Sequence, residues 1–141
     1  MIKTTHPRFI ALVPAAGVGS RFGAALPKQY LTLAGKTVLA HTLHALLLTP
    51  ALDAVLVVLA ENDPYFAESD ANNGADKLHI AYCGGAERVH SVQQGLCALR
   101  QLGYQDEDWV LVHDAARALI TPQLVQTLID ALQADPVGGL L

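Results

Sequence analysis

Five short apolar runs alternate with longer amphipathic stretches along this chain, and this alternation limits the possible folds more than any other feature. The runs are residues 9–13, 54–59, 78–82, 109–113 and 137–141, and most of them are rich in β-branched side chains. Apolar runs of this length are typical of buried strands. Strands that alternate with helices predict an α/β fold, in which a mainly parallel sheet carries helices on both faces.

Three segments between these runs have the periodicity of a helix. Residues 37–48 and 87–102 each place apolar side chains three or four positions apart. Thr121 and Pro122 are typical of an N-cap followed by the first helical position, so we expect a third helix that ends at Ala134. We also expect a short helical turn at residues 63–67.

Composition excludes several classes of protein. The 141 residues are 52% hydrophobic, which predicts a single domain with its own core. The nine Lys and Arg residues form no basic tract and the formal net charge is −4, so we expect no nucleic-acid binding. No apolar run approaches the roughly 20 residues that a membrane span needs. The first residues lack the apolar region of a signal peptide, and Cys83 and Cys97 are expected to be buried free thiols, which together predict a cytoplasmic protein.

The stretch after the first apolar run is expected to bind phosphate. Residues 14–20 are mostly small, and Arg21 and Lys28 follow them. Small residues let the backbone approach a ligand, and exposed amides bind phosphate oxygens, as do a guanidinium and an ammonium group. The spacing is not that of a P-loop, and Phe22 replaces the third glycine of the dinucleotide fingerprint. We therefore expect a polyphosphate site, and the alternative is an ordinary strand-to-helix turn.

Two further loops follow apolar runs, at residues 83–91 and 113–118. Ligands of parallel sheets bind at the carboxyl ends of the strands, so we expect the three loops to meet at one edge. Asp114 comes directly after a run, where a carboxylate can reach a phosphate-bound metal ion such as Mg²⁺. His41 and His44 share an expected helix but have no third ligand, so we expect no metal there.

Four motifs together resemble those of the 2-C-methyl-D-erythritol 4-phosphate cytidylyltransferases, a family of Rossmann-like nucleotidyltransferases. The motifs are AAGVGSR at residues 15–21, PKQY at 27–30, GGAERVHSV at 84–92 and VLVHDAAR at 110–117. The resemblance covers essentially the whole chain in the family's order. It implies the fold of the nucleotide-diphospho-sugar transferases. It also implies transfer of CMP from CTP to 2-C-methyl-D-erythritol 4-phosphate with release of pyrophosphate, a step of non-mevalonate isoprenoid biosynthesis.

The resemblance also implies roles for individual residues. Arg21 and Lys28 would be the catalytic cations, Asp114 would bind Mg²⁺, and Arg117 would lie near the acceptor. The residues implied to bind the nucleotide are Ala15, Ala16, Gly17, Val18, Gly19, Gly85 and Ser91. The alternatives are that Gly85 belongs to an ordinary strand-exit turn and that Ser91 caps its helix.

This chain departs from the family pattern at two positions and in length. Ala86 stands where the family usually has Asp, which removes one acceptor near the base, and Ala118 stands where Pro is common. Family enzymes are longer, and the apolar residues 137–141 read as the start of a strand. We therefore expect residues 1–141 to be one truncated nucleotidyltransferase domain of a protein that forms a homodimer at full length. Two alternatives remain: a cytidylyltransferase for another polyol phosphate such as ribitol 5-phosphate, and a non-catalytic nucleotide-binding fragment.

Overall fold

The computed structural model describes residues 7–17 and 26–134, so the strand predicted at residues 137–141 lies outside the described part. Its centre is a four-stranded sheet with the order β5-β4-β1-β6, in which all neighbouring strands are parallel. The strands are β1 (Phe9–Pro14), β4 (Ala54–Ala60), β5 (Leu78–Gly84) and β6 (Trp109–Val112). Four of the predicted strands are therefore confirmed to within two residues at each end.

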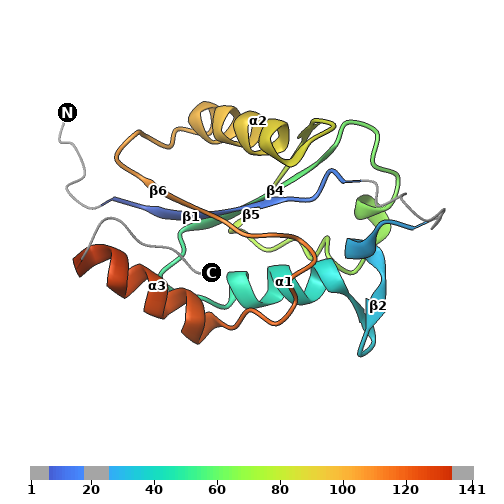
Figure 1. Ribbon diagram of the computed structural model, residues 1–141, viewed down its shortest axis with the longest axis horizontal. Coiled ribbons are helices and arrows are strands. Elements are labelled where there is room, and N and C mark those ends of the chain that lie inside the picture. Colours follow the sequence, from blue (N-terminus) through green and yellow to red (C-terminus); the bar gives the residue numbers. More distant parts are fainter. Residues whose placement is uncertain (1–6, 18–25, 135–141) are drawn as a thin grey trace.

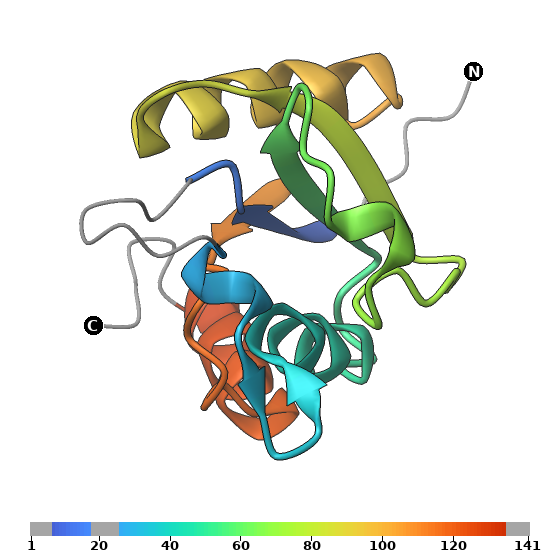
Figure 2. The same cartoon turned by 90° about the vertical axis from the view of Figure 1, so that its right-hand side faces the viewer.

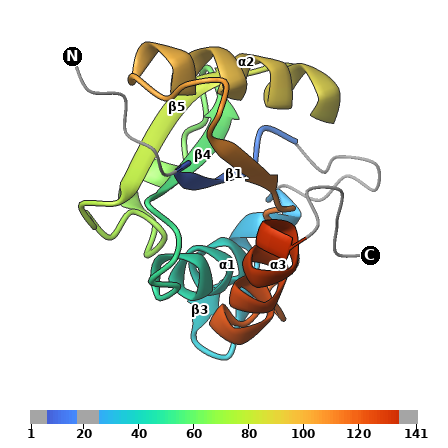
Figure 3. The ribbon, with the colours of Figure 1, turned by 90° about the vertical axis from the view of Figure 1, so that its left-hand side faces the viewer.

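Three helices cover the two faces of this sheet. The helices are α1 (Val38–Leu47), α2 (Arg88–Gln101) and α3 (Pro122–Ala134). Figure 1 shows α2 on one face and α1 and α3 on the other, and Figure 3 shows α1 beside α3. Side-chain caps begin two of the helices, because Ala40 donates its backbone N–H to the Thr37 hydroxyl and Leu124 donates to the Thr121 hydroxyl. The predicted α/β architecture with helices on both faces is therefore confirmed.

The two central strands, β1 and β4, are buried on both faces. Phe9, Ala11 and Val13 of β1 pack into the core under α1 and α3, whereas Ile10 and Leu12 pack into the core under α2. This explains why both strands are continuous apolar runs rather than alternating ones. A Cβ atom at Gly95 of α2 would lie 2.7 Å from the Leu12 Cδ1 atom, so this glycine lets the helix pack closely against the sheet.

The connections reverse direction at β1, and this defines one end of the sheet as the place for a ligand. From β1 the chain passes through α1 to β4 and on to β5, and α2 then returns it to β6 on the other side of β1. The loops after β1 and β6 therefore flank a topological switch point, where ligands of open α/β sheets bind. Figure 2 looks onto this end of the sheet.

Several short elements between β1 and β5 were not predicted in this form. A 3₁₀ turn, η2, spans Lys28–Tyr30, and a small antiparallel hairpin joins β2 (Thr32–Leu33) to β3 (Lys36–Thr37). The hairpin turn places Ala34 and Gly35 at positive φ angles of 51° and 82°. The helical turn expected at residues 63–67 occurs slightly later, as η3 (Phe66–Glu68).

The cysteine prediction was wrong in part. Both cysteines are free thiols, but Cys97 is exposed and Cys83 is half-buried. Cys97 has apolar neighbours in the sequence, yet on α2 the positions facing the sheet are Gly95 and Leu99, so residue 97 points outward. In the described ranges, none of the helices combines the length and the apolar character needed to cross a membrane.

Candidate functional site

The three loops that were expected to meet do line one cavity at the carboxyl end of the sheet. Its volume is about 300 Å³, and the residues around it come from the loops after β1, β5 and β6 and from η2. The lining residues are Pro14, Ala15, Gly17, Lys28, Gln29, Gly85, Ala86, Glu87, Arg88, Ser91, Asp114, Ala115 and Ala116. Many are small or expose backbone, which suits a ligand that must lie close to the main chain.

The loop after β1 is fixed by hydrogen bonds on both sides. Ala15 donates its N–H to the Val58 carbonyl at 2.7 Å, which extends the pairing of β1 with β4 by one residue. The side-chain amide of Gln29 donates to the carbonyls of Ala15 at 3.0 Å and Gly17 at 3.1 Å. These hydrogen bonds hold Ala15 and Gly17 at the wall of the cavity. Three residues predicted to follow it in the site, Val18, Gly19 and Arg21, lie outside the described residues.

Lys28 stands exposed at the cavity while its two neighbours in η2 are buried. Tyr30 donates its hydroxyl to a carboxylate oxygen of Asp63 at 2.7 Å. Burial raises the pKa of the Tyr30 phenol well above its usual value, and the hydrogen bond to Asp63 and the negative charge of that carboxylate raise it further. Lys28 thus lies on an anchored turn and lines the same cavity as Ala15 and Gly17 after β1.

The turn between β5 and α2 packs against the loop after β1. A Cβ atom at Gly84 would lie 2.2 Å from the Ala16 Cβ and 2.9 Å from the Leu59 carbonyl oxygen, so only glycine fits there. The Ser91 hydroxyl is buried, and it accepts a hydrogen bond from the Gly85 N–H at 3.2 Å. Ser91 is therefore not the N-cap of α2, because Glu87 occupies that position. Both predicted residues, Gly85 and Ser91, line the cavity.

The loop after β6 places Asp114 between two arginines. The Arg88 Nε donates to one Asp114 carboxylate oxygen at 2.8 Å, and the Arg117 Nε lies 3.1 Å from the other. These side chains are 36–69% exposed, so water screens the pairs and they contribute little to stability. His113 makes a hydrogen-bonding contact with the Arg117 carbonyl oxygen at 3.2 Å.

Two residues of this site were missed as site residues by sequence reasoning. Arg88 is part of the GGAERVHSV motif, but only its position at the start of α2, opposite Asp114, shows that it faces the cavity. Gln29 follows Lys28 in the PKQY motif, but its burial and its hydrogen bonds to Ala15 and Gly17 are visible only in the structure.

The chemistry of the cavity suits an anion that brings its own metal ion. Among the described residues that line it, Lys28 and Arg88 are cationic and Asp114 and Glu87 carry carboxylates. No cluster of three or more His, Cys, Asp or Glu side chains occurs within residues 7–17 and 26–134. Asp114 alone suits Mg²⁺ carried by phosphate oxygens, because Mg²⁺ is usually bound through one or two carboxylates together with substrate phosphates.

A larger and mainly apolar cavity, of about 720 Å³, lies between β6 and α3. Trp109, Leu111 and Leu128 are among its walls, and it shares Arg88 and Asp114 with the smaller cavity. Arg88 and Asp114 of this ionic cluster therefore belong to the walls of both cavities.

Comparison with known proteins identifies one family by sequence. The model of the 2-C-methyl-D-erythritol 4-phosphate cytidylyltransferase family matches residues 9–141. Curated proteins of that name from Laribacter hongkongensis and Dechloromonas aromatica are 55% and 49% identical, over 95% and 96% of this chain. The chain spans only 56% and 59% of their respective lengths.

Two solved structures described as this enzyme also resemble the chain. A structure described as 4-diphosphocytidyl-2C-methyl-D-erythritol synthase superposes with a TM-score of 0.81 at 29% identity, covering 98% of this chain and 60% of that one. The 2-C-methyl-D-erythritol 4-phosphate cytidylyltransferase of Francisella tularensis superposes with a TM-score of 0.69 at 30% identity. That match covers 91% of this chain and 53% of the other. The predicted Rossmann-like nucleotidyltransferase fold is confirmed by these neighbours.

Proposed function

The chain belongs to the 2-C-methyl-D-erythritol 4-phosphate cytidylyltransferase family, and we propose that it supplies the nucleotide-binding part of an enzyme with this activity. The reaction would transfer CMP from CTP to 2-C-methyl-D-erythritol 4-phosphate and release pyrophosphate. An oxygen of the acceptor phosphate would attack the α-phosphorus of CTP in line. The bond from that phosphorus to the pyrophosphate oxygen would break, and its electron pair would leave with pyrophosphate.

One observation carries this proposal: Ala15 and Gly17 after β1, Lys28 in η2 and Asp114 after β6 line a single cavity, although they come from separate parts of the sequence. Transfer of a nucleotidyl group needs two anions to be held together and the developing charge to be neutralised. A mobile ammonium group, small residues and a carboxylate for a phosphate-bound cation meet those needs. We assign the stabilisation of the transition state to Lys28 together with Arg21.

We propose that the backbone at Ala16 and the turn at Gly85 bind the base and ribose of the nucleotide. The N–H and carbonyl of Ala15 already form hydrogen bonds within the protein, to Val58 and Gln29, whereas Ala16 forms none with another described residue. Ala16 is only 8% exposed, so a ligand that reached its backbone would make a hydrogen bond shielded from water. The role of Ser91 would be to hold the turn at Gly85, with its hydroxyl hydrogen available to the nucleotide.

We assign Mg²⁺ to Asp114, and this assignment rests on the carboxylate that lines the cavity. Bound to the triphosphate, Mg²⁺ would neutralise part of its negative charge. Arg88 and Arg117 now occupy the two oxygens of this carboxylate. An exchange of partners would free both guanidinium groups for phosphate, and Arg117 is the one that we assign to the acceptor.

The finer features of the complete enzyme are also proposals. We propose that the full-length protein works as a homodimer in the cytoplasm. We also propose that residues beyond this chain complete the binding site for the acceptor. Ribitol 5-phosphate is the alternative acceptor, because a related polyol phosphate presents the same attacking group. A nucleotide-binding module without catalysis is the alternative for the 141 residues by themselves, since they span 56–59% of the length of their relatives.

Release of pyrophosphate by the full-length protein tests this proposal. CTP and Mg²⁺ are supplied with either acceptor, and Lys28→Ala is compared with Lys36→Ala, which removes an exposed lysine from the β2–β3 hairpin. We expect turnover with 2-C-methyl-D-erythritol 4-phosphate, a loss of about a hundredfold for Lys28→Ala and less than a twofold change for Lys36→Ala. Turnover only with ribitol 5-phosphate would reassign the acceptor, and CTP binding without turnover would favour the non-catalytic module.

A further inference from the structure

Gln29 is a buried polar residue at the candidate site whose role the reaction itself does not explain. Its side chain is part of η2, directly after Lys28, and the residue is only 7% exposed. Glutamine is rarely buried unless its amide is fully used in hydrogen bonds. Here the amide nitrogen reaches 12 and 14 residues back along the chain, to the carbonyls of Gly17 and Ala15.

The two hydrogen bonds fix which way the peptide groups of the loop face. In a planar trans peptide the carbonyl and the following N–H point in opposite directions. The carbonyl of Ala15 points toward Gln29, so the N–H of Ala16 points away from it. Ala16 makes no hydrogen bond to another described residue, and its neighbours Ala15 and Gly17 both line the cavity.

This orientation matters because the nucleotide offers hydrogen-bond acceptors, both on its base and on its phosphates. A carbonyl turned toward such acceptors would repel them, whereas an amide turned toward them attracts them. Gln29 draws both carbonyls to itself, and no other described side chain donates a hydrogen bond to either of them. The same residue ties the loop to the turn that carries Lys28, so the two parts of the phosphate site keep one relative position.

We propose that Gln29 is a positioning residue for nucleotide binding: it holds the carbonyls of Ala15 and Gly17 away from the nucleotide, so that the Ala16 amide faces it. The inference rests on the proposed function, because it takes the ligand to be a nucleotide. Gln29 itself touches the loop and need not touch the nucleotide. Its effect is therefore on the affinity for CTP and not on the affinity for the acceptor.

The test compares Gln29→Met, which keeps the length of the side chain but removes its donors, with Gln101→Met. Gln101 is exposed at the far end of α2 and serves as the matched control. Binding of CTP with Mg²⁺ and the KM for each substrate are measured in the full-length protein, below the melting temperature of each variant. We expect Gln29→Met to weaken CTP binding by about tenfold, as two lost hydrogen bonds predict, and to leave the KM of the acceptor within twofold. Gln101→Met should change neither.

A purely structural role for Gln29 gives a different result. A variant that is only less stable loses active protein, so its turnover falls while the affinity for CTP and both KM values stay as in the wild type; that outcome overturns the proposal. If Gln29→Met does not fold, Gln29→Asn, which keeps the amide but shortens its reach, must show the same selective loss of CTP affinity. If the wild type binds CTP and both variants bind it equally well, the positioning role is contradicted and the proposed function is not. Wild-type protein that binds no nucleotide contradicts the proposed function as well.

Discussion

Strand β6 has a carboxylate near each of its ends, and the protein holds the two in opposite ways. Asp108, just before the strand, has a side chain that is 7% exposed, whereas the side chain of Asp114, just after it, is 36% exposed. Both are paired with arginine. The same pair of residue types, aspartate and arginine, is therefore buried at one end of the strand and exposed at the other.

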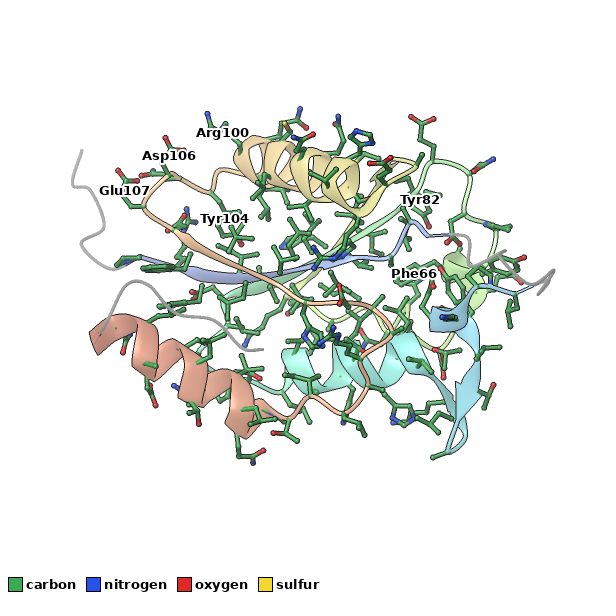
Figure 4. All side chains as sticks on the ribbon, viewed as in Figure 1. Phe66, Tyr82, Arg100, Tyr104, Asp106 and Glu107 are labelled. Carbon is green, nitrogen blue, oxygen red and sulfur yellow. The ribbon has the colours of Figure 1, made fainter. Side chains whose placement is uncertain are left out.

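At the amino end of the strand the ionic group is part of the structure. Arg8 donates to Asp108 from its backbone at 2.8 Å and from its guanidinium group at 2.9 Å, and Gln105 adds a backbone N–H at 2.8 Å. The Arg8 guanidinium also lies 4.3 Å from the centre of the Tyr104 ring. Figure 4 shows Tyr104 at the end of the molecule away from Phe66 and Tyr82. These contacts tie the start of β1 to the start of β6.

At the carboxyl end the ionic group remains open to solvent. Each oxygen of Asp114 has one arginine partner, and both arginines are more than half exposed. A ligand can replace such partners at little cost, because exposed ion pairs contribute only about 0–1 kcal/mol. The difference between the two ends shows that burial and the number of hydrogen bonds, rather than residue type, separate a structural aspartate from one available for binding.

We expect the largest loss of stability at Gly84, where close packing of the backbone rather than charge shapes the site. Gly84→Ala places a Cβ atom 2.2 Å from the Ala16 Cβ and 2.9 Å from the Leu59 carbonyl oxygen. We expect it to lower the free energy of unfolding by about 3 kcal/mol, measured by urea denaturation. Gly17→Ala is the control, since nothing lies within 4 Å of a Cβ atom there, and a similar loss in both variants would contradict this explanation.

Next in size is the loss of the buried carboxylate. Asp108→Asn keeps the shape of the side chain but removes the charge that Arg8 pairs with, so we expect a loss of about 2 kcal/mol in the free energy of unfolding. The control is Asp106→Asn, because Asp106 is 82% exposed and pairs with an exposed Arg100. This control should change stability by less than about 0.5 kcal/mol. Equal effects at positions 106 and 108 would remove the distinction on which the comparison rests.

The pH dependence of stability should follow from the same carboxylate. Burial by itself raises the pKa of Asp108, but hydrogen bonds from Gln105 and Arg8 and the positive charge of Arg8 outweigh it and hold the pKa below its usual value. The folded state therefore binds this proton less readily than the unfolded state does. The stabilisation is complete above about pH 4 and is lost as the pH falls through the folded-state pKa. Acid titration of the unfolding free energy should show a smaller decrease for Asp108→Asn than for the wild type, and identical curves would contradict this.

The smallest effect on stability is expected at the other end of the strand. Asp114→Asn removes two exposed ion pairs, so the free energy of unfolding should change by less than about 0.5 kcal/mol. The Mg²⁺-dependent part of CTP binding should nevertheless decrease, which isothermal titration with and without Mg²⁺ would measure. A variant that loses stability but keeps this binding would make Asp114 a structural residue like Asp108.

Local patterns predicted the fold well where local contacts decide it. The β-branched runs of β1 and β4 are buried on both faces, and Thr121 with Pro122 marks the start of α3 correctly. The β2–β3 hairpin escaped prediction because its strands are two residues long. Its turn also uses Ala34 at a positive φ, which a non-glycine residue seldom adopts.

The site was predicted less completely, because its key contacts are long-range. Lys28 and Asp114 stand in motifs that carry their chemistry, so they were found from the sequence, and the structure brings them to one cavity. Gln29 and Arg88 form hydrogen bonds with residues 12 and 26 positions away in the sequence, and no local sequence pattern predicts such pairs. Gly84 likewise needs the position of Ala16 before its small size has a reason.

The most direct test of this account is a binding titration of the full-length protein with CTP, UTP, ATP and GTP in Mg²⁺. We predict that CTP binds more tightly than the other three nucleotides. Lys28→Ala should weaken CTP binding, and Asp108→Asn should leave it unchanged in folded protein. Equal binding of all four nucleotides, or an affinity for CTP that Lys28→Ala does not alter, would contradict a cytidylyl site at the carboxyl end of the sheet.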